Sequence, residues 1–297
     1  MNWLARQSFL GVDSDEILTD LTVGIVGLGG GGSHVSQQLA HMGIGGFVLL
    51  DPDTCEDSNL NRLVGATAAD AKDDRPKVDI AARLILSVNP RARVTKHQLA
   101  WQEAPGSLKI CDIIIGGLDS VRAKDELERF CRRFLIPYID MGMDVHTIGS
   151  QFLIAGQVIL SSPGGPCLRC LGVVTEGALA AEGARYGAAG GRPQVVWPNG
   201  VLASLAVGLV TQLVCPWQEK PIDTAYFEYD GNKNTVMASS RLQAISDRVC
   251  PHHPPNETGE LRFDIRKPWT IPSTSHQPRA KRPWWKRMMA SITRRPS

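Results

Sequence analysis

The sequence has no apolar run of the roughly 18–20 residues that a membrane-spanning helix needs. Its first six residues also lack the basic region and long apolar stretch that mark a secretory signal. The sequence therefore predicts a protein without a membrane span, and a cytoplasmic location is the default expectation.

Cysteine is scarce, with seven residues in a chain of 297, which excludes a disulfide scaffold. Hydrophobic residues make up 43% of the chain and charged residues 21%. This composition suits an α/β protein with one large core, or one core plus an appendage.

Acidic residues are absent from residue 266 onward, where nine Lys or Arg occur. The remainder carries 23 basic and 30 acidic residues, so a mildly acidic globule precedes a basic segment. No nucleic-acid-binding motif accompanies the basic segment, which argues against direct nucleic-acid recognition. Its tryptophans, Trp269, Trp284 and Trp285, suit either docking to an acidic partner or anionic membrane, or a solvated, disordered end.

Strands and helices alternate from about residue 21 to residue 159. Apolar runs predict the strands, and Pro90 and Pro137 help to end two of the helices. This alternation predicts a Rossmann-like, doubly wound α/β fold with a mostly parallel sheet. The predicted strands are 23–26, 47–50, 92–97, 110–115, 138–141 and 151–159, and the predicted helices are 33–41, 77–88 and 122–134.

The composition changes after Pro166. Residues 172–191 are rich in Gly and Ala, so we predict a mobile crossover loop over 171–199. An apolar helix over 201–214 and an antiparallel C-terminal extension of two strands, near 224–229 and 235–239, follow. The sequence thus predicts one domain over 1–262 and a basic, Trp-containing, disordered tail over 263–297.

A glycine-rich turn follows the first predicted strand. It contains Gly27, Gly29, Gly30 and Gly32, and the next predicted strand ends in Asp51. In a βαβ unit this arrangement holds an adenosine nucleotide, because the glycines let the backbone approach phosphates and the carboxylate accepts ribose hydroxyls. Enzymes that bind NAD, FAD or ATP all use this arrangement, so the glycine turn alone does not show which nucleotide is bound.

Charged residues farther along the chain favour ATP. When a carboxylate attacks the α-phosphate and expels pyrophosphate, cations must spread the charge of three phosphates. Arg62 and Lys77 suit this role, and Asp119, at a predicted strand end, is placed to hold Mg²⁺. Each also has a simpler interpretation, since Arg62 or Lys77 could be a solvated charge and Asp119 could cap the next helix.

These motifs together resemble the ubiquitin-activating superfamily, whose bacterial members are the ThiF, MoeB and HesA adenylyltransferases. The resemblance runs from Arg6 to about Ser240. The glycine turn looks like the GxGGxGS motif of that family, and residues 51–62 are similar to its DxDxVxxSNLxRQ segment. Residues 75–77 with Asn89-Pro90, residues 139–142, and Arg6-Gln7 resemble three further motifs, in the same order along the chain.

The resemblance implies that residues 1–262 are an ATP- and Mg²⁺-dependent adenylation domain. Its substrate would be the C-terminal carboxylate of a small ubiquitin-like or sulfur-carrier protein ending in glycine, activated as an acyl adenylate with release of pyrophosphate. The implied nucleotide site comprises Gly27, Gly29, Gly30, Gly32, Asp51 on the ribose, and Asp53, with Asn59, Arg62 and Lys77 around the phosphates. Asp119 would be the Mg²⁺ ligand and catalytic carboxylate, and Arg6 would act across a homodimer.

Two positions depart from the family motifs. The final Gln of the phosphate segment is Leu63 here, and the Asn that usually follows the catalytic Asp is Ser120. Neither change removes a charged group, so we expect activity to survive.

Four residues have the spacing of a metal site. Cys167 and Cys170 form a CxxC, and Cys250 with His253 forms a CxxH, which together suit a closed, structural Zn²⁺ site. His252 is the less favoured histidine, because two intervening residues give the better chelate spacing. A redox dithiol of Cys167 and Cys170 is the alternative.

The predicted crossover loop contains no cysteine, and Val196 stands where many family members carry a nucleophilic one. A thioester on that residue is therefore disfavoured, although a separate conjugating enzyme could accept the acyl group. Three alternatives stay open: activation of a peptide or modified tRNA base, a non-catalytic ATP-binding adaptor, and a nicotinamide oxidoreductase.

Overall fold

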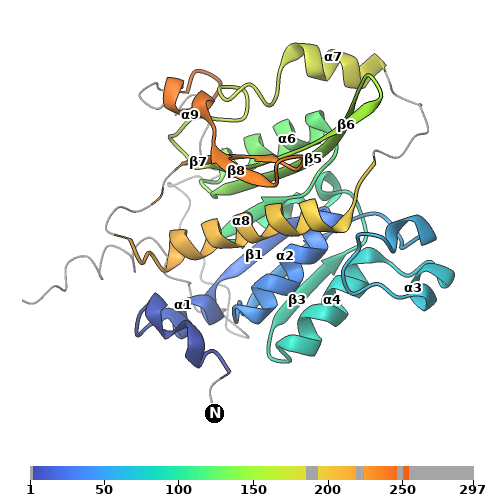
Figure 1. Ribbon diagram of the computed structural model, residues 1–297. Helices are drawn as coiled ribbons and strands as arrows, with labels where there is room; N and C mark the ends of the chain where they lie inside the picture. Colours follow the sequence, from blue (N-terminus) through green and yellow to red (C-terminus); the bar gives the residue numbers. More distant parts are fainter. Residues whose placement is uncertain (1–2, 185–192, 219–221, 223, 246–249, 254–297) are drawn as a thin grey trace, which may run out of the picture.

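An eight-stranded sheet in the order β3-β2-β1-β4-β5-β6-β7-β8 forms the centre of this computed structural model (Figure 1). The structure describes residues 3–184, 193–218, 222, 224–245 and 250–253. The expected disordered tail over 263–297 and the domain boundary at 262 lie outside these residues.

Five neighbouring strands run parallel, because helices connect them on the two faces of the sheet. The three strands nearest the middle are buried along their whole length, which explains their unbroken apolar sequences. The parallel strands are β1 (Thr22–Val26), β2 (Gly46–Leu50), β3 (Arg93–His97), β4 (Ile113–Gly116) and β5 (Tyr138–Ile148).

The last three strands continue the sheet antiparallel to their neighbours. These are β6 (Gln151–Ser161), β7 (Ala225–Asp230) and β8 (Thr235–Ala238). The predicted doubly wound, mostly parallel sheet with an antiparallel C-terminal extension is thus confirmed. The fifth strand is longer than predicted, because it pairs with β6 over eleven residue pairs as a hairpin beyond the parallel region.

Helices cover both faces of the sheet. Side chains of α2 (Gly30–His41), α4 (Lys77–Val88) and α8 (Val196–Val214) join one apolar cluster with Ile25 and Leu49. Residues of α6 (Val121–Arg133) join a second cluster on the opposite face, together with alternate strand residues. Figure 1 shows α8 crossing in front of the sheet beside α2.

Short helices fill the connections. Sequence reasoning did not predict them, since segments of three to nine residues carry too few turns for a clear apolar period. They are η1 (Ala5–Leu10), α1 (Ser14–Asp20), η2 (Asp57–Asn59), α3 (Ala68–Lys72), η3 (Trp101–Glu103), α5 (Pro105–Leu108), α7 (Glu176–Ala184) and α9 (Ser240–Ile245).

The predicted crossover loop over 171–199 therefore holds regular structure. It contains α7, and its last residues are the first turn of α8, which begins at Val196 rather than at residue 201. Gly and Ala in this segment reduce its apolar surface without preventing a helix, since Ala is the best helix former.

Helix α8 has 19 residues and is, among the described residues, the one helix long and apolar enough to cross a membrane by length and composition. This corrects the expectation that no apolar run reaches that length. In the structure α8 packs against α2, β5 and β6, and 56% of its most apolar window is buried.

Outside the sheet, the buried carboxylate of Asp70 pairs with two half-exposed arginines, Arg83 and Arg75, and fixes the loop before α4. Its carboxylate receives two hydrogen bonds from Arg83, at 2.8 and 2.7 Å, and others from Thr67. The side chain of Asp70 is 2% exposed and that of Arg83 is 47% exposed. The hydrogen bonds from Arg83 hold the pKa of Asp70 well below its usual value, against the effect of burial.

We predict that Asp70→Asn lowers the free energy of unfolding by about 2 kcal/mol at neutral pH, because a half-solvated charge-assisted pair is lost. Since the folded pKa lies below the unfolded value of about 3.9, this contribution is complete above that value and is lost as pH falls below it. Urea unfolding across pH 3–7 measures the difference. An equal difference at both ends of this range, or an equal loss in the exposed control Asp73→Asn, would contradict the prediction.

Candidate functional site

The glycine turn between β1 and α2 lies at the carboxyl edge of the parallel strands. Gly27 has a φ of +87°, and a Cβ there would lie 2.6 Å from the carbonyl oxygen of Gly117, which follows β4. A side chain at this position would therefore separate the ends of β1 and β4. The turn leads directly into α2, so its amides lie at a helix N-terminus, where anions bind.

Asp51 connects the end of β2 to this turn. Its Oδ2 accepts the amide of Leu28 at 2.6 Å, and its Oδ1 accepts the amide of Asp53 at 2.9 Å. Burial raises the pKa of Asp51, while the charge of Lys77 and the two amides oppose that shift. A buried carboxylate beside a glycine turn is the arrangement that receives ribose hydroxyls in nucleotide-binding βαβ units.

Lys77 joins this group from the start of α4. Its Nζ donates to Asp53 Oδ2 at 2.7 Å, and its backbone amide donates to Asp53 O at 3.0 Å. The Lys77 side chain is 11% exposed and that of Asp53 is 62% exposed, so the Lys77 ammonium is more deeply buried than the Asp53 carboxylate. The structure thus brings the predicted residues Asp51, Asp53 and Lys77 together from two segments.

Asn59 and Arg62 make contacts within their own loop. Asn59 Oδ1 accepts the amide of Glu56, which closes a capping box around η2. Arg62 donates to the Ser58 carbonyl at 2.6 Å and to Asn61 Oδ1 at 2.9 Å. In this structure neither side chain reaches Asp119 through a hydrogen bond or ion pair.

A pocket opens on the other side of the glycine turn. Asp119 lies at its edge and accepts a hydrogen bond from Gln194 Nε2 at 3.3 Å. Ser120 caps α6 by accepting the amide of Ala123 at 3.1 Å, so Asp119 itself is not the cap. The pocket is lined by Gly29, Gly30, Gly31, Gly117, Asp119, Met141, Gly142, Met143, Gln194, Asn199 and Leu202.

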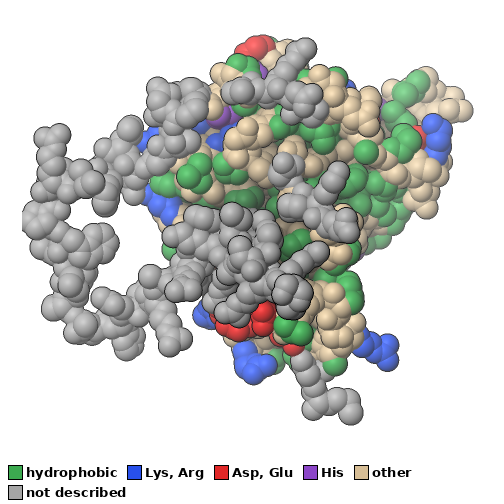
Figure 2. Space-filling view, turned by 90° about the vertical axis from the view of Figure 1, so that its left-hand side faces the viewer, with side chains coloured by type: hydrophobic (Ala, Val, Ile, Leu, Met, Phe, Trp, Pro, Cys, Tyr) green, Lys and Arg blue, Asp and Glu red, His purple; other side chains and the backbone are tan. Residues whose placement is uncertain are grey.

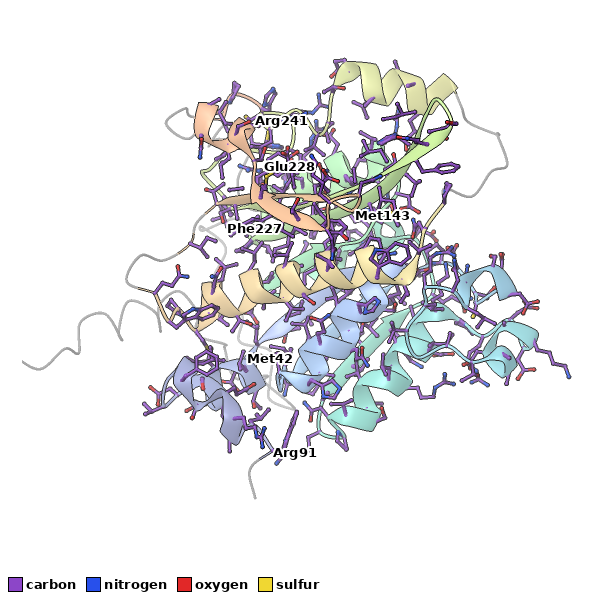
Figure 3. All side chains as sticks on the ribbon, viewed as in Figure 1. Met42, Arg91, Met143, Phe227, Glu228 and Arg241 are labelled. Carbon is purple, nitrogen blue, oxygen red and sulfur yellow. The ribbon has the colours of Figure 1, made fainter. Side chains whose placement is uncertain are left out.

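Met143 is labelled in Figure 3, where it lies on β5 next to α8. Sequence reasoning missed Gln194, Asn199 and this methionine as lining residues. The one sequence signal for these lining residues was the polar Asn199 in the first turn of an otherwise apolar helix.

A buried charged network supports the floor of the pocket. Lys124 of α6 donates to both oxygens of Asp140, at 2.7 and 2.9 Å, and to the Met141 carbonyl at 2.9 Å. Tyr138 donates to the same carboxylate at 3.0 Å. Burial raises the pKa of Asp140 and the lysine charge opposes it. This network holds the main chain of β5 where it borders the pocket, and no sequence motif revealed it.

Arg6 lies away from this pocket. It belongs to η1, whose neighbour Gln7 donates to the Met42 carbonyl at the far end of α2. Met42 is labelled in Figure 3 beside the N-terminal helices. Because a 12-residue helix is about 18 Å long, Arg6 does not join the pocket at the other end of α2 in the same chain.

Three cysteines and a histidine form a second site. Cys170 Sγ lies 3.6 Å from both Cys167 Sγ and Cys250 Sγ, and His252 Nδ1 lies 3.3 and 3.4 Å from the first two sulfurs. Tetrahedral zinc with Zn–S near 2.3 Å and Zn–N near 2.0 Å gives separations of about 3.5–3.8 Å. The observed separations are at or slightly below this range and all four donor atoms lie within 4.8 Å of one another, so a small adjustment would let these residues hold a metal.

The histidine in this cluster is His252, whereas the sequence predicted His253, which lies instead in a second group with Glu128 and Cys167. Nδ1 is the ring nitrogen nearest the main chain, so one intervening residue after Cys250 suffices for it to reach the sulfurs. His253 turns instead toward α6, where its Nε2 lies 3.9 Å from Glu128 Oε2.

The pKa values of the three thiols shift in different directions. Burial raises the pKa of Cys167 and of Cys170, whereas for Cys250 the amides of His252 and His253 and the neighbouring thiols outweigh burial and lower the pKa. A thiolate is the form that binds metal.

Helix α6 positions the CxxC segment. Glu128 is fully buried and accepts the Leu168 amide on both oxygens, at 2.9 and 3.1 Å. Arg132 donates to the carbonyls of Gly165 and Pro166, at 3.0 and 2.8 Å. The loop before the cysteines is therefore fixed by one face of α6, which spacing alone did not reveal.

The fold and these two sites define a doubly wound α/β protein with a glycine turn at the carboxyl edge of its parallel strands and a Cys₃His cluster. The model of the ThiF family matches residues 4–251, and the chain belongs to that family.

Curated relatives agree with this assignment. Over 163 residues the chain is 32% identical to the molybdopterin-synthase adenylyltransferase of Escherichia coli, covering 54% of this chain and 61% of that protein. Over 150 residues it is 30% identical to the tRNA threonylcarbamoyladenosine dehydratase of Bacillus subtilis, covering 49% and 58%. The chain thus spans about three fifths of the length of these relatives.

A solved structure of E. coli MccB with succinimide has a TM-score of 0.67 at 22% identity, covering 80% of this chain and 71% of that one. At this identity the likeness supports the fold.

We predict that the purified chain holds about one metal ion and that His252→Ala loses it, because Nδ1 is the fourth donor. His253→Ala is the matched control and should retain the metal. Metal content measured by mass spectrometry, with a thiol-reactive zinc dye as a second readout, tests this. Retention by His252→Ala together with loss by His253→Ala would reverse the assignment.

Proposed function

We propose that the protein is an ATP-dependent adenylyltransferase. It activates the C-terminal carboxylate of a small ubiquitin-like or sulfur-carrier protein that ends in glycine, forming an acyl adenylate and releasing pyrophosphate. The observation that carries the proposal is the position of the glycine turn. It has Asp51 and Lys77 on one side and the Asp119 pocket on the other, so the nucleotide and the carboxylate would meet over one turn.

The relatives' names support the substrate class. One is a molybdopterin-synthase adenylyltransferase, and another, 28% identical over 166 residues that cover 54% of this chain and 62% of that protein, is the sulfur carrier protein ThiS adenylyltransferase of E. coli.

The residues fit ATP and Mg²⁺. Asp51 would bind the ribose, and the amides at the start of α2 would face the phosphates. Asp119 is exposed and, within the described part of the chain, accepts one hydrogen bond, from the Gln194 amide, so its oxygens are available for Mg²⁺. Bound Mg²⁺ would neutralise developing charge on the phosphates.

Lys77 and Arg62 would exchange their present partners for phosphate oxygens. Lys77 leaves a well-exposed carboxylate, Asp53, and Arg62 leaves a carbonyl and an amide of its own loop. Such exchanges cost little, because exposed ion pairs and local hydrogen bonds contribute little net stability. Asn59 then contributes by holding the loop that carries Arg62.

We propose that Arg6 completes the site of a second subunit in a homodimer. Arg6 lies too far from the pocket of its own chain to contact a nucleotide there, so it can act on a nucleotide only in the pocket of a second subunit. Exposed apolar side chains surround the same region: Phe9 is 70% exposed, Val12 is fully exposed and Trp217, which stacks edge-on against Phe9, is 44% exposed. Such a patch is typical of an interface.

Acidic side chains gather at the lower edge of the face in Figure 2, near α1. They would form the polar rim of that interface.

The Cys₃His cluster is proposed to hold a structural Zn²⁺, which would fasten the C-terminal segment to the loop after β6. No cysteine lines the pocket among the described residues, so we propose that the acyl acceptor is another molecule, such as a conjugating enzyme. A cytoplasmic location remains our expectation. The tRNA threonylcarbamoyladenosine dehydratase relative supports a modified tRNA base as the second candidate substrate.

We predict that ATP–pyrophosphate exchange occurs with a carrier protein ending in diglycine and that Asp119→Asn reduces its rate at least 100-fold, because the metal-binding charge is lost. The exposed control Asp73→Asn should exchange normally. Thermal melting checks that each variant is folded. Normal exchange by Asp119→Asn would remove this residue from the mechanism, and no exchange with any diglycine protein would overturn the substrate class.

We also predict that Arg6→Ala and Asp119→Asn are each inactive alone and complement each other when mixed. A heterodimer of the two has one site with both residues intact, so random exchange restores about a quarter of the wild-type rate. Exchange rates measured after co-refolding test this. No recovery, despite heterodimers seen by differential tagging, would place Arg6 outside the partner's site.

A further inference from the structure

Asn199 is a buried amide in the wall of the pocket that no motif explains. It lies in the first turn of α8 and is 6% exposed. Its carboxamide covers the glycine turn: a Cβ on Gly30 would lie 2.5 Å from Nδ2 and 2.7 Å from Cγ. The absence of a side chain at Gly30 is therefore what admits Asn199 to the pocket.

The orientation of this amide is fixed by its one hydrogen bond. Asn199 Nδ2 donates to the Val195 carbonyl at 2.9 Å. Because a carbonyl can only accept, the nitrogen must face Val195, and Oδ1 must face away from it. Oδ1 lies 3.2 Å from the position of a Cβ on Gly30 and 3.6 Å from that of a Cβ on Gly31, so it faces the glycine turn.

No donor from the described residues bonds Oδ1 of Asn199. Its position in the pocket wall gives it access to whatever binds there. The side chain is only 6% exposed and borders the pocket, so an N–H or O–H of a bound ligand is the donor that would pair with this oxygen.

Because Asn199 Oδ1 can only accept a hydrogen bond, only ligand groups with an N–H or O–H can pair with it. Phosphate and carboxylate oxygens carry no donor at neutral pH, so they are repelled by Oδ1. Residues 141–143 of β5 also line the pocket. A peptide that reaches the glycine turn with its carboxylate carries an N–H two atoms behind the carboxyl carbon.

We propose that Asn199 is a specificity residue whose Oδ1 accepts the last peptide N–H of the acyl substrate. It selects carboxylates that belong to a peptide over carboxylates that lack this N–H. The proposal rests on the proposed function, since it assumes that a carboxylate is activated in this pocket.

The test uses two stable mimics of the acyl adenylate. One is N-acetylglycyl sulfamoyl adenosine, which contains the peptide N–H, and the other is acetoxyacetyl sulfamoyl adenosine, in which an ester oxygen replaces it. Calorimetry measures the affinity of the full-length protein for both. The wild type should bind the amide mimic at least about tenfold more tightly, because the ester leaves a buried acceptor unpaired.

Asn199→Ala should bring the two affinities within about twofold of each other, chiefly by weakening the amide mimic. Ser204→Ala is the matched control on the same helix, because its hydroxyl bonds only to the Gly200 carbonyl and is exposed. It should keep the wild-type ratio. Thermal melting and ATP affinity, which should stay unchanged, show that Asn199→Ala is folded with its nucleotide site intact.

Four results would overturn the inference. Equal affinities of the wild type for both mimics would show that the protein does not recognise the peptide N–H. This result would not affect the proposed function. If Asn199→Ala keeps the wild-type ratio of affinities for the two mimics, another acceptor recognises the peptide N–H. A loss of ATP affinity in that variant would place Oδ1 on the nucleotide's ribose or adenine. Failure of both mimics to bind a wild type that binds ATP would overturn the proposed function as well.

Discussion

The close approach of three strand ends at the glycine turn is the constraint on which both sides of the site depend. Gly27 allows the end of β1 to lie against Gly117 after β4, and Asp51 at the end of β2 accepts the Leu28 amide within the turn. These contacts fix where α2 begins, and with it the position of its N-terminal amides. A side chain at Gly27, or a neutral residue at Asp51, would loosen both the glycine turn and the Asp119 pocket.

Helix α6 has a comparable role on the opposite face. Its Lys124 supports β5 through Asp140 and Met141, while its Glu128 and Arg132 hold the loop that carries Cys167 and Cys170. One helix thus connects the floor of the pocket to the metal cluster. Glu182 of α7 adds to this arrangement by accepting the first two amides of α6, at 3.0 and 2.9 Å, next to Asp119. The loop that carries Cys167 and Cys170 and helix α7 therefore both contact α6.

Much of the fold could be predicted because its signals are local. Lys77–Val88 was predicted with its observed bounds, since Pro76 sets its start and its apolar period is clear. The glycine turn and Asp51 were likewise recognisable from their order along the chain. The long hairpin of β5 and β6, helix α7 and the early start of α8 were not, because pairing and packing partners decide them.

The sequence by itself determined the family, the doubly wound sheet, and the residue types of a nucleotide site and a metal site. Those are properties of local pattern and motif order. Only the tertiary structure decided that His252 rather than His253 faces the cysteines, that Arg6 lies far from its own pocket, and that Asn199 covers Gly30. The reason is that side-chain direction and separations between distant segments follow from packing, which no spacing along the chain encodes.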